Sequence, residues 1–202
     1  MVAGIPSAWV TRWAHLVAPG ADVLDVASGG GRHARWFAAR GHTVLAVDRD
    51  AEALASMTGC DGIATLAADL EGASWPLPAD RKFGAVVVTN YLHRPLFAHL
   101  IESLAPGGVL IYETFAAGNE SVGKPSNPAF LLAPGELLDA VRGRLRVVAY
   151  EDGFIETPRA AYMQRICAVF ESQVSHLAEP RMGNALTFGN TPSGSPRYGL
   201  TG

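Results

Sequence analysis

Short apolar runs alternate with amphipathic segments over the first two thirds of the chain. Apolar runs of four to seven residues, bounded by glycine, proline or small polar residues, predict strands at 23–27, 43–47, 63–66, 83–89 and 109–113. The amphipathic segments predict a first helix capped by Ser7 and later helices at 32–40, 51–57, 96–104 and 136–141. Strands that alternate with helices in this way are typical of a parallel sheet. The pattern therefore predicts an α/β fold with helices on both faces of the sheet.

The last third departs from this alternation. Residues Ala117 to Pro134 are rich in Gly, Asn, Ser and Pro, which predicts a long irregular loop. Two strands are expected at 145–150 and 162–170, and the second has no helix before it. That strand can pair antiparallel with its neighbour.

Composition limits the kind of protein. The chain has 202 residues, 49% hydrophobic content and a formal net charge of -3, which favour one domain over residues 1–181. Residues 182–202 hold few large apolar side chains and predict a flexible tail. The near-neutral charge gives no basic footprint, so a nucleic-acid partner is not expected. The sequence gives no indication of an oligomeric state.

Cysteine content and hydropathy favour a cytoplasmic protein. Cys60 and Cys167 lie far apart, so neither a disulfide framework nor a metal site is expected. No apolar run approaches the roughly 20 residues of a membrane helix, and no basic and apolar leader begins the chain. We therefore expect no membrane partner.

A glycine-rich turn, Asp25-Val26-Ala27-Ser28-Gly29-Gly30-Gly31, joins the first strand to the following helix. Glycines at this position let the backbone approach a nucleotide-like ligand closely. The turn also fits the dinucleotide pattern Gly29-x-Gly31-x-x-Ala34, with Asp48 near the place of a ribose-binding acid. Asp25 separates the two interpretations, because its carboxylate would repel a pyrophosphate but can pair with an amino group.

Acidic residues follow three successive strands, at Asp25, Asp48 and Asp69. Each alone could be a helix cap or a surface residue. Because the carboxyl ends of parallel strands share one edge of the sheet, we expect the three acids to converge on one crevice. Asp48 is placed to accept hydrogen bonds from both ribose hydroxyls.

The Asp25–Gly31 turn and the segment Leu104–Ile111 resemble class I S-adenosylmethionine-dependent methyltransferases, with Ala27 in place of the first motif glycine. The resemblance covers about residues 7 to 170. It implies a Rossmann-like sheet of seven strands in the order 3-2-1-4-5-7-6, with the last strand antiparallel. Residues 127–137 and 148–153 are more loosely similar to tellurite-resistance, TehB-like methyltransferases.

This resemblance implies S-adenosyl-L-methionine as the cofactor, with its adenine beside Asp69 and Leu70. The residues expected to bind it are Asp25, Ala27, Ser28, Gly29, Gly31, Asp48, Arg49, Asp69, Leu70 and Asn90. Arg12 could reach the cofactor carboxylate or lie on a solvated helix face.

The fourth strand ends in Thr89-Asn90-Tyr91-Leu92-His93, where this class places residues against the methyl donor and the acceptor. Tyr91 and His93 are the catalytic candidates, although His93 could instead cap the next helix. Tyr112 and Glu113 could face the acceptor or serve in sheet packing and on the surface. The expected reaction is in-line methyl transfer to an unidentified small molecule, with the Ala117–Pro134 loop as a mobile lid.

Two other functions remain open. A nicotinamide-dependent oxidoreductase fits the turn, but no second glycine-rich turn follows Glu113. A noncatalytic partner subunit could keep the fold and the cofactor.

Overall fold

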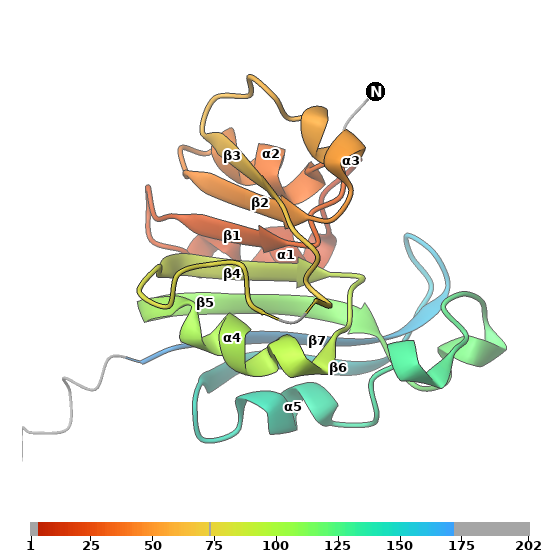
Figure 1. The fold of residues 1–202 in the computed structure, drawn as a ribbon. Helices are drawn as coiled ribbons and strands as arrows, with labels where there is room; N and C mark the ends of the chain where they lie inside the picture. The colour runs from red at the N-terminus through yellow and green to blue at the C-terminus, as the bar shows by residue number, and fades with distance from the viewer. Residues whose placement is uncertain (1–3, 73, 172–202) are drawn as a thin grey trace, which may run out of the picture. The chain divides into compact units, whose positions relative to one another are not determined.

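The computed structural model describes residues 4–72 and 74–171, and seven strands of this region form one sheet (Figure 1). The order is β3-β2-β1-β4-β5-β7-β6, and β7 runs antiparallel to both of its neighbours. The strands are β1 Val23–Val26, β2 Val44–Asp48, β3 Ile63–Ala67, β4 Phe83–Thr89, β5 Leu104–Phe115, β6 Arg146–Ile155 and β7 Ala161–Val169. The predicted fold class and strand order are confirmed.

Helices cover both faces of this sheet (Figure 1). Side chains of α1, α2 and α3 pack in one core cluster, and those of α4 and α5 pack in the other. The helices are α1 Ala8–Trp13, α2 Arg32–Ala38, α3 Ala51–Ala55, α4 Phe97–Glu102 and α5 Glu136–Val141, with 3-10 turns η1 Ala14–Leu16, η2 Arg94–Leu96, η3 Asn119–Ser121 and η4 Pro128–Phe130. None of the helices described here has both the length and the apolar character needed to cross a membrane.

Strand β4 shows why a continuous apolar run forms a central strand. Val86 and Val88 enter the cluster beneath α4 and α5, whereas Ala85 and Val87 enter the cluster beneath α1 to α3. Because successive side chains point to opposite faces, a strand covered on both sides needs apolar residues at every position. The carboxyl end of this strand leads directly into Asn90.

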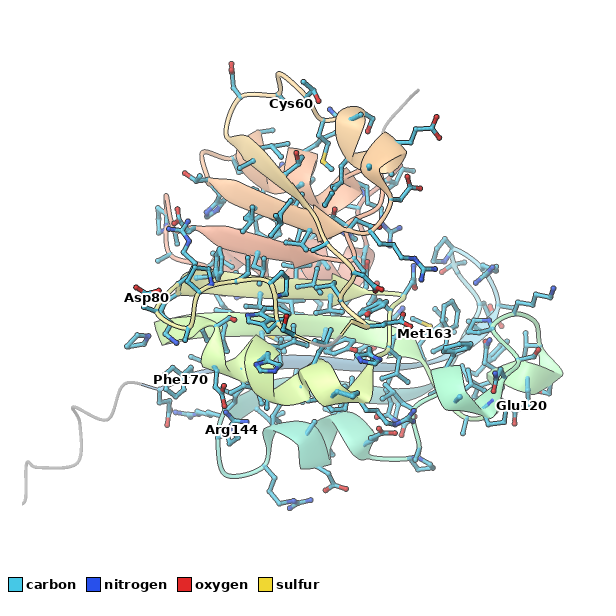
Figure 2. All side chains as sticks on the ribbon, in the orientation of Figure 1. Cys60, Asp80, Glu120, Arg144, Met163 and Phe170 are labelled. Atoms are coloured by element: carbon cyan, nitrogen blue, oxygen red, sulfur yellow. The ribbon has the colours of Figure 1, made fainter. Side chains whose placement is uncertain are left out.

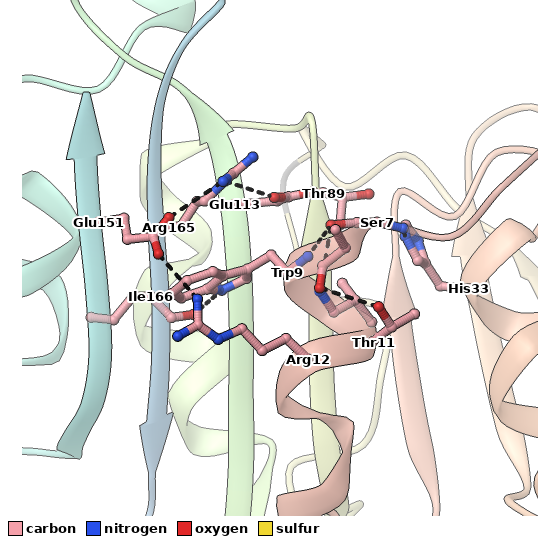
Figure 3. Close-up of polar contacts among 12 residues, drawn as sticks. Ser7, Trp9, Thr11, Arg12, His33, Thr89, Glu113, Glu151, Arg165 and Ile166 are labelled. Atoms are coloured by element: carbon pink, nitrogen blue, oxygen red, sulfur yellow. Dashed lines mark hydrogen bonds and ion pairs between the residues drawn. The ribbon is translucent and has the colours of Figure 1, made fainter. Parts of the chain in front are cut away.

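The first helix begins where the sequence predicts. The Ser7 hydroxyl accepts hydrogen bonds from the amides of Trp9 and Val10 at 3.1 and 3.4 Å. The Ser7 amide donates to Nε2 of His33 at 3.1 Å, and the Trp9 indole donates to the Ile166 carbonyl at 3.2 Å (Figure 3). Helix α1 is thereby bonded to both α2 and β7, and Trp9 packs in the core.

Several element boundaries differ from the predictions. The expected turn at 106–108 lies within β5, because the Gly107 amide donates to the Phe170 carbonyl and extends the pairing with β7. The helix expected to reach Leu104 therefore ends at Glu102. Strand β6 runs five residues past its predicted end, because Ile155 pairs with Ala161 across a hairpin.

The Ala117–Pro134 segment is a long loop, as predicted, and it contains the short 3-10 turns η3 and η4. Asn119 is buried; its amide group donates to the Pro125 carbonyl at 2.8 Å, and its Oδ1 accepts from the Tyr162 amide at 3.2 Å. Arg94 donates to the carbonyls of Ala129 and Leu131, each at 2.8 Å. Figure 2 shows this segment, with Glu120 labelled, beyond the Met163 end of the sheet. These bonds hold both halves of the segment against the rest of the fold. A role as a mobile lid stays a prediction.

The predicted tail at 182–202 lies outside the described residues, as does the end of the predicted domain at 181.

Candidate functional site

Asp48 ends β2 and connects two backbone turns. Its Oδ2 accepts a hydrogen bond from the Gly29 amide at 2.7 Å, and its Oδ1 accepts from the Asp50 amide at 2.9 Å. Each carboxylate oxygen keeps a further lone pair for a ligand. The glycine turn after β1 and the carboxyl end of β2 are therefore held side by side, as the sequence predicted.

Two cavities open at this edge of the sheet, on either side of Ala27. The smaller, about 210 Å³, is lined by Ala27, Asp48, Arg49, Ala68, Asp69, Leu70, Glu71 and Tyr91. The larger, about 750 Å³, is lined by Gly4, Ala27, Ser28, Gly29, Gly30, Arg32, Arg35, Ala53, Ser56, Thr89 and Asn90. Ala27 lines both cavities, so the two adjoin and are considered together as one candidate site. Most of the residues expected to bind the cofactor lie in one lining or the other.

Two residues of the site have left-handed backbone conformations that non-glycine residues rarely adopt. Ala27 has φ 52° and Asn90 has φ 56°, at the ends of β1 and β4. Buried Tyr112 holds the second turn, because its hydroxyl donates to the Tyr91 carbonyl at 2.8 Å. Such conformations persist only where the surrounding structure fixes them, and they concentrate at ligand sites.

The glycines of the turn serve different purposes. Gly29 has φ 51°, and a Cβ there would meet open space, so its backbone is free to face a ligand. Gly31 has φ 74°, and a Cβ there would lie 1.9 Å from Sδ of buried Met57. Gly29 therefore suits close approach of a ligand, and Gly31 suits close packing of the start of α2 against the turn that follows α3.

Asp25 lies apart from the cavities. It is 1% exposed, it lines neither cavity, and its Oδ2 accepts from the Ala34 amide at 3.0 Å. Burial raises the pKa of this carboxyl group to about 7. The structure thus gives Asp25 a partner in α2, and contact with a ligand amino group stays a prediction.

Asp25 and His33 predict opposite dependences of stability on pH. Burial raises the pKa of Asp25 to about 7 and lowers that of His33 to about 3. Between about pH 4 and 7 folded Asp25 keeps a proton that the unfolded chain has lost, so its contribution to stability falls as pH rises. Between about pH 3 and 6.5 unfolded His33 keeps a proton that the folded protein lacks, so its contribution rises.

We therefore expect Asp25→Asn to give a free energy of unfolding that rises from pH 4.5 to 6.5. His33→Gln should give one that falls over the same range. Both replacements keep an acceptor atom for the Ala34 or Ser7 amide. Urea denaturation at several pH values measures both slopes, and identical curves for the two variants and the parent would contradict these pKa directions.

The catalytic candidates separate in the structure. Tyr91 lines the smaller cavity, and burial raises the pKa of its hydroxyl to about 12, so this hydroxyl is protonated near neutral pH. His93 lines neither cavity and precedes η2 as its N-cap residue, without a side-chain capping bond. Roles for Tyr91 and His93 in catalysis stay predictions.

Other candidates lie outside the cavities. Glu113 pairs with Arg165 at 3.2 Å, Arg165 with Glu151 at 3.3 Å, and Glu151 with exposed Arg12 at 3.4 Å (Figure 3). Tyr112 is fully buried. Of the two interpretations of Arg12, the structure favours the solvated helix face.

Several residues of the larger cavity were not predicted from the sequence, among them Arg32, Arg35 and Thr89. Arg32 directly follows the glycines and Thr89 directly precedes Asn90. Adjacency to a predicted ligand turn was the signal that could have identified these two residues.

Two buried polar atoms fit a bound ligand. The hydroxyl of Ser28 in the larger cavity and that of Tyr91 in the smaller have no hydrogen-bond partner among the described residues. Buried polar atoms are nearly always bonded, so an unpaired hydroxyl at each end suggests a polar ligand along the whole site. S-adenosylmethionine has nucleoside and amino-acid ends that suit this distribution.

Residues 23–108 match a family model described as a methyltransferase domain. They contain the glycine turn, Asp48, Asp69 and Asn90. A comparison with curated proteins finds no match.

Solved structures share the fold at low sequence identity. TehB from Haemophilus influenzae is 18% identical with a TM-score of 0.67, over 82% of this chain and 63% of that chain. A TehB-like S-adenosylmethionine-dependent methyltransferase from Corynebacterium glutamicum is 19% identical with a TM-score of 0.60, over 84% and 91% of the two chains. The glycopeptide N-methyltransferase MtfA with S-adenosyl-L-homocysteine is 19% identical with a TM-score of 0.59, over 83% and 90%. This chain therefore spans less than two thirds of the length of Haemophilus influenzae TehB.

Proposed function

We propose that this chain, which carries a class I S-adenosylmethionine-dependent methyltransferase domain, transfers the methyl group to a small-molecule acceptor by in-line displacement. The observation that carries this proposal is the pair of cavities that meet at Ala27. A volume of about 750 Å³ lies within the range of about 300–1,000 Å³ common for small-molecule sites.

The residues of the smaller cavity would hold the adenosine end. Asp48 would accept hydrogen bonds from the ribose hydroxyls, since its carboxylate is already fixed by the Gly29 and Asp50 amides. Asp69 and Leu70 would lie against the adenine, with Arg49 at its edge. Among the expected cofactor residues, Asp25 would act indirectly, by fixing α2 beneath the glycine turn.

The residues of the larger cavity would hold the methionine end and the acceptor. When bound, the cofactor supplies a methyl group activated by a positively charged sulfur. The chain then has to align the acceptor with that methyl group and exclude water. The fixed turn at Asn90 is placed for this task, and no general base is part of the proposal. We place the activity in the cytoplasm, in keeping with the two free cysteines, Cys60 and Cys167.

Transfer of a labelled methyl group tests the proposal. The purified chain is incubated with methyl-labelled S-adenosylmethionine and a panel of thiols, amines, metalloid oxyanions and RNA. We expect label in one or more of the small molecules. Arg40→Gln should retain the activity, because Arg40 is an exposed residue just after α2 and lines neither cavity. Label in RNA alone would contradict a small-molecule acceptor, and no transfer to any class would contradict the enzymatic function.

A further inference from the structure

The two cavities differ in the charge of their linings. Asp48, Asp69 and Glu71 line the smaller cavity together with one arginine, Arg49. The charged residues that line the larger cavity are both arginines, and none of the carboxylates described in this structure belongs to that lining. The end of the site beyond Ala27 is therefore suited to a negatively charged group.

Only one of the two arginines is available to a ligand. Arg35 is committed to α3 and the turn after it, because its guanidinium donates to Cys60 Sγ at 2.8 Å and to the Ser56 carbonyl. Arg32 makes two long contacts, each of 3.4 Å, to the Ile5 carbonyl and to Thr89 Oγ1. Contacts of this length are weak hydrogen bonds.

Arg32 also lacks an ion-pair partner in the part of the chain that the structure describes. Its side chain is half-buried in the lining of the larger cavity. Removing a guanidinium from water is unfavourable unless hydrogen bonds or an opposite charge compensate. An anion in the cavity would supply both, and the planar guanidinium fork matches a carboxylate or another oxyanion.

We propose that Arg32 binds an anionic group, a carboxylate or a comparable oxyanion, in the larger cavity beside Thr89 and Asn90. This inference rests on the proposed function, since it places the adenosine end of the cofactor at Asp48. The anionic group has two possible sources at this end of the site. One is the carboxylate of the methionine portion of the cofactor, and the other is the methyl acceptor.

Calorimetry with two nucleosides tests the first source. S-adenosylhomocysteine carries the carboxylate, and 5′-methylthioadenosine lacks the whole amino-acid portion. If the cofactor is the source, Arg32→Gln should lose about tenfold to a hundredfold in affinity for S-adenosylhomocysteine, with its affinity for methylthioadenosine unchanged. Arg32→Lys, which keeps the charge but loses the fork, should lose less, and Arg40→Gln should match the parent.

Anion titration of the S-adenosylhomocysteine complex tests the second source. Acetate and inorganic phosphate are added while the amide chemical shifts of Gly30 and Ser56, in the cavity lining, are followed. If the acceptor is the source, the shifts should saturate in the parent protein and stay unchanged in Arg32→Gln. Both Arg32 variants are first compared with the parent by thermal denaturation.

A selective loss in either experiment supports the inference and identifies the source. It is overturned if both Arg32 variants bind S-adenosylhomocysteine as the parent does and neither anion gives an Arg32-dependent shift. Failure of the parent protein itself to bind S-adenosylhomocysteine would instead contradict the proposed function.

Discussion

Gly31→Ala is expected to lower the free energy of unfolding by about 2–5 kcal/mol, the largest stability effect that the site predicts. The residue has φ 74°, a conformation that costs an alanine about 1–2 kcal/mol. Its new Cβ would also lie 1.9 Å from Met57 Sδ, and Met57 is 1% exposed, so the sulfur has little room to move. Overpacking of this kind typically costs about 1–3 kcal/mol. Urea denaturation at fixed pH measures the change.

Gly30→Ala is the matched control. Gly30 has no positive φ, and a Cβ there would meet only Ser56 Oγ at 4.0 Å, so we expect a loss below about 1 kcal/mol. Combining Gly31→Ala with Met57→Ala should cost less than the sum of the two single changes, because the shorter side chain removes the clash. Equal losses at Gly30 and Gly31, or strict additivity with Met57, would contradict this explanation.

Asp48→Ala is expected to weaken the binding of S-adenosylhomocysteine by about 1.5–3 kcal/mol, or roughly tenfold to 150-fold. The side chain fixes the glycine turn through the Gly29 amide and keeps lone pairs directed at the smaller cavity. Its removal takes away both the ligand acceptor and one restraint on the turn. Isothermal titration calorimetry measures the affinity.

Two variants separate these contributions. Asp48→Asn keeps one acceptor oxygen and should lose less affinity than Asp48→Ala. Asp139→Ala removes an exposed carboxylate of α5 that pairs with Arg142, and it should bind as the parent does. Unchanged affinity in Asp48→Ala, with an unfolding free energy near that of the parent, would exclude a role for Asp48 in holding the ribose.

The local sequence predicted those elements whose hydrophobic pattern follows directly from burial, such as a central strand covered on both faces of the sheet. Strand β4 has the predicted bounds, because every residue from Phe83 to Val88 except Gly84 is buried and apolar and no competing turn signal interrupts the run. The cap at Ser7 and helix α5 are likewise determined by residues within one helical turn. The strand order came from the family resemblance, since pattern alone leaves several orders open.

Long-range contacts account for what the sequence did not predict. The Pro106–Gly108 turn became part of β5 through a bond to Phe170, more than 60 positions away in the sequence. The Ala117–Pro134 segment is fixed by Asn119 bonding to Tyr162 and by Arg94 bonding to Ala129 and Leu131. A high content of Gly, Pro and Asn predicts that a segment is a loop, but it does not predict which distant residues form hydrogen bonds with that loop.

The same limit applies to the site. The place of Asp48 in the site was predicted because a residue at the carboxyl end of a parallel strand lies at that edge of the sheet in any rotamer. The burial of Asp25 and the exposure of Arg12 depend on which face each side chain takes and what packs against it. Arg32 was not predicted as a site residue for the same reason. Its contact with Thr89 depends on the distance between α2 and β4, which the local sequence does not give.

The competing dinucleotide interpretation makes one measurement decisive for the central claim. Purified protein is titrated by calorimetry with S-adenosylhomocysteine and, separately, with NAD. We predict saturable binding of S-adenosylhomocysteine at one site per chain and no detectable heat with NAD, because residues 23–108, which contain the glycine turn and Asp48, match a methyltransferase domain. Saturable binding of NAD together with no binding of S-adenosylhomocysteine would contradict the methyltransferase function.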